Sequence, residues 1–153
     1  MMKSSAEQAA IEKRLTAAGV RPTAQRIALA RFLLNGADHP TAEDVKKWAD
    51  ENFPKMSLAT VYNTLALLVR AKLIKEVKLP HTSRVIYDDR VSAHYHFLDE
   101  KSGKIYDVDP SEVEVKPRLK KNASVRGVEV LLRGRWESES RQIRARRGKT
   151  HVQ

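Results

Sequence analysis

The stretch SLATVYNTLALLVRAKLIKE, residues 57–76, is the most informative part of the sequence. Aliphatic side chains recur in it at the spacing of a helix, which predicts a helix with one face turned to a core. These apolar positions are Leu58, Val61, Leu65 and Leu68. Ser57 is the predicted N-cap, and no acidic residue occurs from there to Ile74. An N-terminal end without carboxylates suits a surface of phosphates and base edges. The pattern fits a recognition helix and an ordinary amphipathic helix equally well.

The residues around this stretch predict three further helices and a hairpin. Gly19 ends the first helix, Asn35-Gly36 ends the second, and Pro54 follows the third, which begins at an N-cap threonine, Thr41. The helices are expected over residues 5–18, 23–35 and 41–52, with Ala9, Ala10 and Leu15 inward in the first. Two alternating runs, residues 73–79 and 84–88, indicate a β-hairpin. Helices followed by a hairpin predict a winged helix.

The positive charge is concentrated at the two ends of the chain. Residues 1–90 hold 15 Lys and Arg against 10 Asp and Glu, and residues 133–153 hold 7 against 2. The middle, residues 91–132, is neutral with 7 of each, and the whole chain carries +10. Such a charge attracts polyanions, of which nucleic acid is the first candidate, although a merely basic soluble protein is not excluded.

Composition excludes several classes of protein. The 153 residues include no cysteine, so disulfides, thiolate zinc sites and cysteine nucleophiles are absent. No apolar run reaches the length of a membrane span, and the N-terminus lacks the apolar segment of a signal peptide. We therefore expect a cytoplasmic protein with no membrane partner, folded as one compact domain or two small ones.

The second half of the chain has the character of β-structure. Strands are predicted over residues 94–98, 104–108 and 125–132, and residues 109–122 would be a short helix if Pro117 did not interrupt it. Three short strands with one apolar face need a partner to bury that face, which predicts a homodimer. The Arg-rich tail suits contact with phosphates through Arg141, Arg144, Arg146 and Arg147.

A metal site is indicated by His94-Tyr95-His96. Residues two apart on a strand point to the same side, so both imidazoles are expected to converge. A pair of histidines is a weak signal alone, and a chance pair is an alternative. Three more candidate ligands are His39, Asp88 and Asp107. Imidazole and carboxylate together suit zinc, iron or manganese.

Several motifs together resemble the ferric uptake regulator family of bacterial repressors. The N-terminal motifs are Gly19-Val20-Arg21-Pro22-Thr23-Ala24-Gln25-Arg26, His39-Pro40-Thr41-Ala42-Glu43-Asp44 and Ser57-Leu58-Ala59-Thr60-Val61-Tyr62-Asn63-Thr64-Leu65. The C-terminal ones are His94-Tyr95-His96 and Gly103-Lys104-Ile105-Tyr106-Asp107. The resemblance covers nearly the full chain, and its Ala-Thr-Val-Tyr core is the most specific part.

The resemblance implies an α/β (α+β) fold with four parts. These are a winged-helix DNA-binding domain, a hinge, a small α/β dimerisation and metal-sensing domain and a basic tail, at residues 1–88, 89–92, 93–133 and 134–153. The function that the resemblance implies is that of a metal- or haem-responsive transcriptional regulator, which binds operator DNA as a homodimer and controls iron-related genes.

The resemblance also carries over site residues. The implied DNA-binding residues are Arg21, Thr23, Gln25, Arg26, Ser57, Ala59, Thr60, Tyr62 and Asn63. The implied ligands of one divalent ion per subunit, iron or manganese with zinc as a further candidate, are His39, Asp88, His94, His96 and Asp107.

The chain also departs from the family pattern. Asp99 and Ser102 stand where the family carries a Cys-x-x-Cys pair, so no structural zinc held by cysteine thiolates is expected. Ala93 and Tyr95 occupy two ligand positions of an additional metal site. The missing cysteines and Asn63 after Tyr62 resemble the iron response regulator subgroup. That subgroup implies haem as a ligand of His94 and His96, although Tyr95 replaces a histidine there.

Two alternatives from other classes remain open. A metal-dependent hydrolase could use His94, His96 and Asp107, but no nucleophile or general base lies beside them in sequence, and five protein ligands leave little room for substrate. A winged-helix RNA-binding protein is the other. The uncharged side chains of Thr60, Tyr62 and Asn63 favour base-edge readout in duplex DNA instead. We therefore expect a regulator and not an enzyme.

Overall fold

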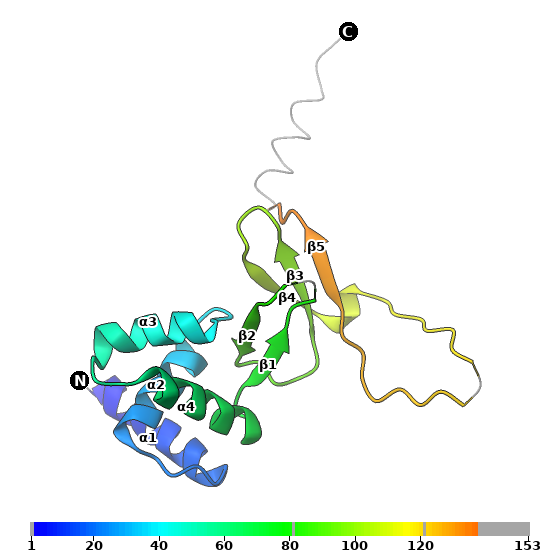
Figure 1. Cartoon of the computed structure of the whole chain (residues 1–153). Coiled ribbons are helices and arrows are strands. Elements are labelled where there is room, and N and C mark those ends of the chain that lie inside the picture. Colours follow the sequence, from blue (N-terminus) through cyan, green and yellow to red (C-terminus); the bar gives the residue numbers. More distant parts are fainter. Residues whose placement is uncertain (1, 81, 121, 138–153) are drawn as a thin grey trace. The chain divides into compact units, whose positions relative to one another are not determined.

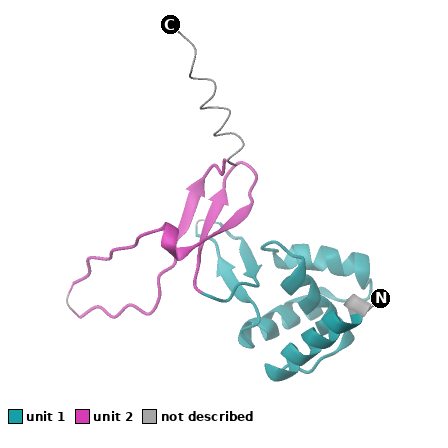
Figure 2. Ribbon diagram, turned by 180° about the vertical axis from the view of Figure 1, so that it is seen from behind, with its two compact units in different colours: residues 1–92 teal, residues 93–153 magenta. Residues whose placement is uncertain are grey.

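The chain folds into two compact units, residues 1–92 and 93–153 (Figure 2). The computed structural model describes residues 2–80, 82–120 and 122–137. Helices gather in the first unit and small sheets complete both, so the fold is α+β (Figure 1). The tail arginines Arg141, Arg144, Arg146 and Arg147 lie outside the described residues.

Unit 1 contains four helices, and local capping fixes the starts of three of them. They are α1 (Met2–Ala17), α2 (Ala24–Asn35), α3 (Ala42–Asn52) and α4 (Leu58–Arg70). Thr23, Thr41 and Ser57 are the N-caps of the last three, and each side chain accepts a backbone N–H of the first turn. Helix α2 ends at Asn35 with Gly36 as its C-cap, as the sequence predicts.

The core of unit 1 is built on the apolar face of α4. Val61, Leu65 and Leu68 have no exposed surface. The prediction for Leu58 was wrong, because it lies at the first position of the helix and its side chain is 46% exposed. Ala9 and Ala10 are also exposed, and Ile11 and Leu15 bury the inner face of α1 instead.

A hairpin follows α4, in the order of elements predicted for this half of the chain. Strand β1 (Lys75–Lys78) pairs antiparallel with β2 (Val85–Asp88), with Lys75 opposite Asp88. The backbone N–H of Tyr87 donates to the carbonyl of Pro40, 2.9 Å away. That bond attaches β2 to the loop between α2 and α3.

Unit 2 contains a three-stranded sheet in the order β4-β3-β5. Strand β3 (Tyr95–Asp99) is antiparallel to β4 (Ile105–Val108) and parallel to β5 (Leu131–Gly134). Gly103 adopts a φ of 72° in the turn between β3 and β4, a conformation that suits glycine. A single 3-10 turn, η1 (Pro110–Glu112), follows β4.

The predicted boundaries in unit 2 need three corrections. His94 lies just before β3 and not in it. The possible helix over residues 109–122 is confined to η1, and the described residues from there to 122 are not helical. Pro117, in this segment, lacks the N–H that a helix needs. The last strand is four residues long instead of the predicted 125–132, because its pairing with β3 extends only from Leu131 to Gly134. Trp136, after β5, stacks on Tyr106 with ring centroids 4.6 Å apart.

In residues 2–80, 82–120 and 122–137, no helix is both long and apolar enough to cross a membrane.

Candidate metal centre and nucleic-acid interface

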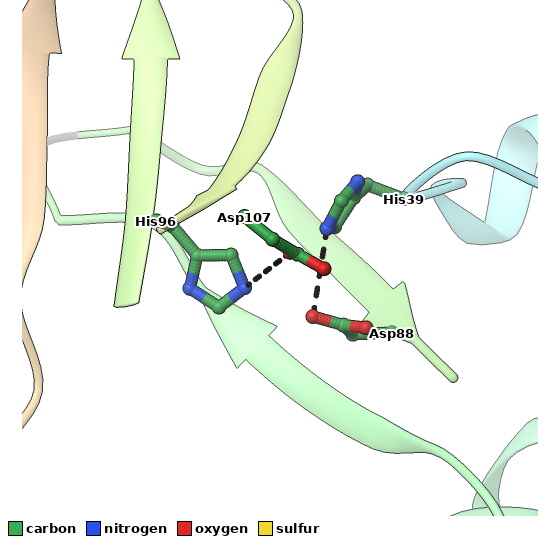
Figure 3. A group of neighbouring side chains, drawn as sticks. All are labelled: His39, Asp88, His96 and Asp107. Carbon is green, nitrogen blue, oxygen red and sulfur yellow. Dashed lines mark ion pairs between the residues drawn. The ribbon is translucent and has the colours of Figure 1, made fainter. Parts of the chain in front are cut away.

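In unit 1, His39 and Asp88 form a pair of potential metal ligands. His39 Nε2 lies 3.5 Å from Asp88 Oδ2, and the two side chains are 11% and 1% exposed (Figure 3). Asp88 ends β2, and its Oδ1 accepts the backbone N–H of Arg90 at 2.8 Å. The bond from Tyr87 to Pro40 holds β2 beside the loop that carries His39. Both potential ligands are thus positioned by backbone contacts of unit 1.

The orientation of His39 is fixed by its neighbours. Its Nδ1 is 2.8 Å from Asp38 Oδ1, so an N–H at Nδ1 would leave Nε2 with a lone pair on the side of Asp88. Metal-binding histidines use this carboxylate arrangement to fix their tautomer. His39 also has a φ of 48°, which is left-handed and uncommon for a residue other than glycine.

In unit 2, His94 and His96 converge on Asp107. His96 lies opposite Asp107 in the antiparallel register of β3 and β4 (Figure 3). The Nε2 atoms of His94 and His96 are 3.3 Å and 3.8 Å from Asp107 Oδ1, and the rings meet edge to face with centroids 4.6 Å apart. Their side chains are 0% and 8% exposed, so both imidazoles are buried, and both lie beside the same carboxylate.

These separations fit the chemistry of metal ligands. Zinc–nitrogen and zinc–oxygen bonds of about 2.1 Å place two ligands of a tetrahedral ion about 3.4 Å apart. The three imidazole–carboxylate separations, 3.3 Å, 3.5 Å and 3.8 Å, lie near that value. An ordinary N–H···O hydrogen bond is shorter, about 2.9 Å. Unit 1 offers one imidazole and one carboxylate, and unit 2 offers two imidazoles and one carboxylate. Such donors suit zinc, iron and manganese.

The N-terminal end of α4 combines capping residues with exposed side chains. Ser57 Oγ accepts the N–H of Thr60 at 3.1 Å, and the two hydroxyl groups are 3.0 Å apart. Both predicted DNA contacts therefore also serve the helix end. Tyr62 is 43% exposed, and Asn63 beside it is exposed too. Their positions agree with a surface available to a large partner.

The other predicted DNA contacts lie around the start of α2. Thr23 is the N-cap and accepts the N–H of Arg26 at 3.3 Å. Arg26 Nη1 donates to the carbonyl of Arg21 at 3.0 Å. Arg21 and Gln25 have exposed side chains. The group thus mixes two residues with local structural roles and two exposed ones.

Sequence reasoning missed one residue of this surface, Glu43. The hydroxyl of Tyr62 donates to Glu43 Oε1 at 3.1 Å. This hydrogen bond, together with the charge of Glu43, raises the pKa of Tyr62 above its ordinary value. The two residues are 19 positions apart on different helices, so no local sequence pattern predicts their contact.

Comparison with known proteins identifies the family. Residues 17–132 match the model of the ferric uptake regulator family. The chain belongs to the ferric uptake regulator family. This membership confirms the family inferred from the motifs. Because the relatives are named as regulators, it also agrees with the prediction that the chain is not an enzyme.

Individual relatives support the same assignment. The chain is 44% identical over 89 residues to the peroxide operon regulator of Bacillus subtilis (strain 168), a match that covers 58% of this chain and 61% of that protein. The chain therefore spans about three fifths of the length of this curated relative. The iron response regulator subgroup stays a prediction, since this relative is named for peroxide.

Solved structures of the family share the fold. The ferric uptake regulator of Vibrio cholerae has a TM-score of 0.64 at 19% identity, covering 82% of this chain and 98% of that one. That of Pseudomonas aeruginosa, determined with manganese, has a TM-score of 0.61 at 23% identity over 83% and 98% of the two chains. At these identities the likeness concerns the fold alone.

Proposed function

We propose that this protein is a metal-responsive transcriptional regulator that binds operator DNA as a homodimer. The observation that carries the proposal is the convergence of His94 and His96 on Asp107, in a chain of this family. Two buried imidazoles and a carboxylate gathered at one place offer the nitrogen and oxygen donors that a divalent cation recognises.

One divalent ion per subunit is proposed to use both ligand groups. The pair His39 and Asp88 supplies two donors, fewer than the four to six that zinc, iron or manganese take. His94, His96 and Asp107 supply three, also short of a full shell. Together the five donors would complete the coordination shell of one ion. Manganese or iron suits this mixture of nitrogen and oxygen, and zinc would compete.

Metal binding would regulate the protein through its differential affinity for two arrangements of the chain. An ion that needs donors from both units favours the arrangement in which all of them reach it. The resulting shift is limited by the ratio of metal affinities in the two states. By the same linkage, DNA that prefers that arrangement would bind metal-loaded protein more tightly.

DNA recognition is assigned to α4 and the start of α2. Thr60, Tyr62 and Asn63 are proposed to face base edges in the major groove, as the N-terminal residues of a recognition helix do. The remaining proposed contacts, to the backbone of the duplex, are Arg21, Thr23, Gln25, Arg26, Ser57 and Ala59. Two such helices in a dimer would read a pseudo-palindrome.

Control of iron-related genes is the proposed role, and haem is the weaker candidate for a second effector. A haem bound by His94 or His96 needs an exposed imidazole edge. The His94 side chain has no exposed surface and that of His96 is 8% exposed. Haem would therefore bind only after the residues that cover them move.

Selection of DNA from a random pool, with manganese present, tests the function. The selected duplexes should share a pseudo-palindromic site. Fluorescence anisotropy with that duplex should show tighter binding with manganese than with a chelator. Equal binding of every duplex, a preference for RNA, or an affinity for DNA that does not change with manganese would contradict the proposal.

A further inference from the structure

We propose that Glu43 is a positioning residue for the reading of DNA sequence. Its carboxylate accepts a hydrogen bond from the Tyr62 hydroxyl, so the Tyr62 oxygen can act only as an acceptor toward DNA. The inference rests on the proposed DNA-binding function and adds a specificity-determining residue to it.

The contact joins the starts of two helices. Tyr62 is the fifth residue of α4, and Glu43 is the second residue of α3. The Tyr62 hydroxyl donates to Glu43 Oε1 over 3.1 Å. Tyr62 is 43% exposed and Glu43 is exposed as well. The pair therefore lies at the surface, where a macromolecule can reach the phenol.

The position of Glu43 is fixed by the start of α3. Thr41 and Asp44 form a capping box, in which Asp44 N donates to Thr41 Oγ1 at 3.1 Å and Thr41 N donates to Asp44 Oδ2 at 2.9 Å. Ala42 and Val45, on either side of Glu43 and Asp44, are buried. A carboxylate in the first turn is also favoured by the helix dipole. Glu43 is thus held where it meets Tyr62.

The chemistry of the pair sets the polarity of the phenol. A tyrosine hydroxyl has one proton to donate and lone pairs with which to accept, whereas an ionised carboxylate can only accept. While the proton points to Glu43, the Tyr62 oxygen offers only its acceptor side to a third group. The same hydrogen bond is the first cause of the raised pKa of Tyr62.

An acceptor in the major groove selects between bases. Adenine presents its N6 amino group and cytosine its N4 amino group as donors, whereas thymine O4 and guanine O6 and N7 are acceptors. Tyr62 held by Glu43 would therefore favour adenine or cytosine at the base it meets. Thymine or guanine there would place two acceptors face to face, which costs affinity.

The charge of Glu43 lowers affinity for every duplex, so the discrimination comes from its hydrogen bond to Tyr62. Glu43, Tyr62 and Asn63 line one groove with residues of the hairpin, among them Glu76 and Arg84. A carboxylate in this groove repels phosphates and weakens binding to every duplex alike.

Glu43→Gln tests the inference, with Glu51→Gln as control for the lost charge, since Glu51 is an exposed residue of the same helix. The glutamine amide can accept from Tyr62 or donate to it, so the polarity of the phenol is no longer fixed. Binding is measured on the selected duplex and on variants that change each base pair in turn. Glu43→Gln should reduce discrimination about tenfold at one base pair, within the range of a single base contact.

Tyr62→Phe should lose discrimination at that same base pair, and the double variant should lose no more than either single one. Glu51→Gln should raise binding of all duplexes slightly without changing their order. Unchanged discrimination in Glu43→Gln, or additive losses in the double variant, would overturn the inference. If wild type itself does not discriminate between duplexes, the proposed function fails with it.

A second measurement needs no DNA. The pKa of Tyr62, followed by NMR of a 13C-labelled ring carbon and assigned with Tyr62→Phe, should fall in Glu43→Gln. It should stay unchanged in Glu51→Gln. An equal pKa in wild type and Glu43→Gln would mean that the two side chains do not meet in solution, and would overturn the inference.

Discussion

Arg21 provides the simplest test of the backbone contacts at the scale of single residues. Its exposed guanidinium is proposed to bind a phosphate, which carries no sequence information. Arg21→Ala should weaken binding to all duplexes by a similar factor and reduce the slope of log affinity against log salt by about one. Anisotropy titrations at several salt concentrations measure both quantities. An unchanged slope would remove Arg21 from the interface.

Asn63 tests the reading of bases. An asparagine can contact adenine through two hydrogen bonds, and such a contact discriminates by about 1–3 kcal/mol. Asn63→Ala should therefore relax the preference at one base pair while leaving the salt slope as in wild type. Competition between the operator and single-base variants of it measures the change. Retained preference at every position would place α4 in a different orientation.

Some features of single residues can be predicted from the sequence, and others cannot. The convergence of His94 and His96 was predicted from their spacing within one strand, although His94 lies one residue before β3. Ser57 and Thr41 are recognisable as caps for an equally local reason. The contact between Glu43 and Tyr62 joins two helices, so it depends on their packing and leaves no trace in either segment.

At the scale of elements, α3 depends on its capping box. The Thr41 side chain satisfies the N–H of Asp44, and loss of such a cap costs about 1 kcal/mol. Thr41→Ala should lower the free energy of unfolding by about that amount, as measured by urea denaturation. Glu51→Ala, an exposed substitution within the same helix, is the control and should change little. Equal free energies of unfolding for Thr41→Ala and wild type would show that the Thr41 cap does not stabilise α3.

The turn between β3 and β4 should respond to acid. The Ser102 hydroxyl donates to Asp99 at 2.5 Å, and chiefly through this bond the pKa of Asp99 lies below its ordinary value. A carboxyl with a lowered folded-state pKa stabilises the fold above its unfolded pKa, and this contribution disappears as the pH falls through the folded value.

Asp99→Asn cannot titrate and should remove that pH dependence. Wild type should lose more free energy of unfolding than Asp99→Asn when the pH is lowered from about 6 to about 3, around the ordinary aspartate pKa of about 3.9. Denaturation in a series of buffers measures the difference. Parallel curves for the two proteins would show that the Ser102 contact does not persist in solution.

Elements differed in how well sequence predicted them. The helices of unit 1 carry their own caps and stops, so their bounds were close. Strands need a partner, and the last one is confined to Leu131–Gly134 by the length over which it pairs with β3. The apolar residues Val125 and Val128, which lie before it, are exposed. Apolar, β-branched residues alone do not determine where a strand pairs.

At the scale of the whole molecule, a homodimer is the expected assembly. Light scattering at micromolar concentration should give twice the 17.4 kDa mass of the chain. The physical reason is the small sheet of unit 2, whose three strands cannot bury their apolar face alone. A mass of one chain, independent of concentration, would contradict the dimer and the pseudo-palindromic site that follows from it.

We propose that one divalent ion uses ligands from both units. Calorimetric titration of manganese into wild type, His39→Ala and His96→Ala tests this proposal. One ion per chain should bind to wild type, and either substitution should weaken that single event by at least tenfold, since removing supporting groups of a metal site already costs about 10–100-fold. Two independent ions per chain, each lost in only one of the variants, would contradict the account.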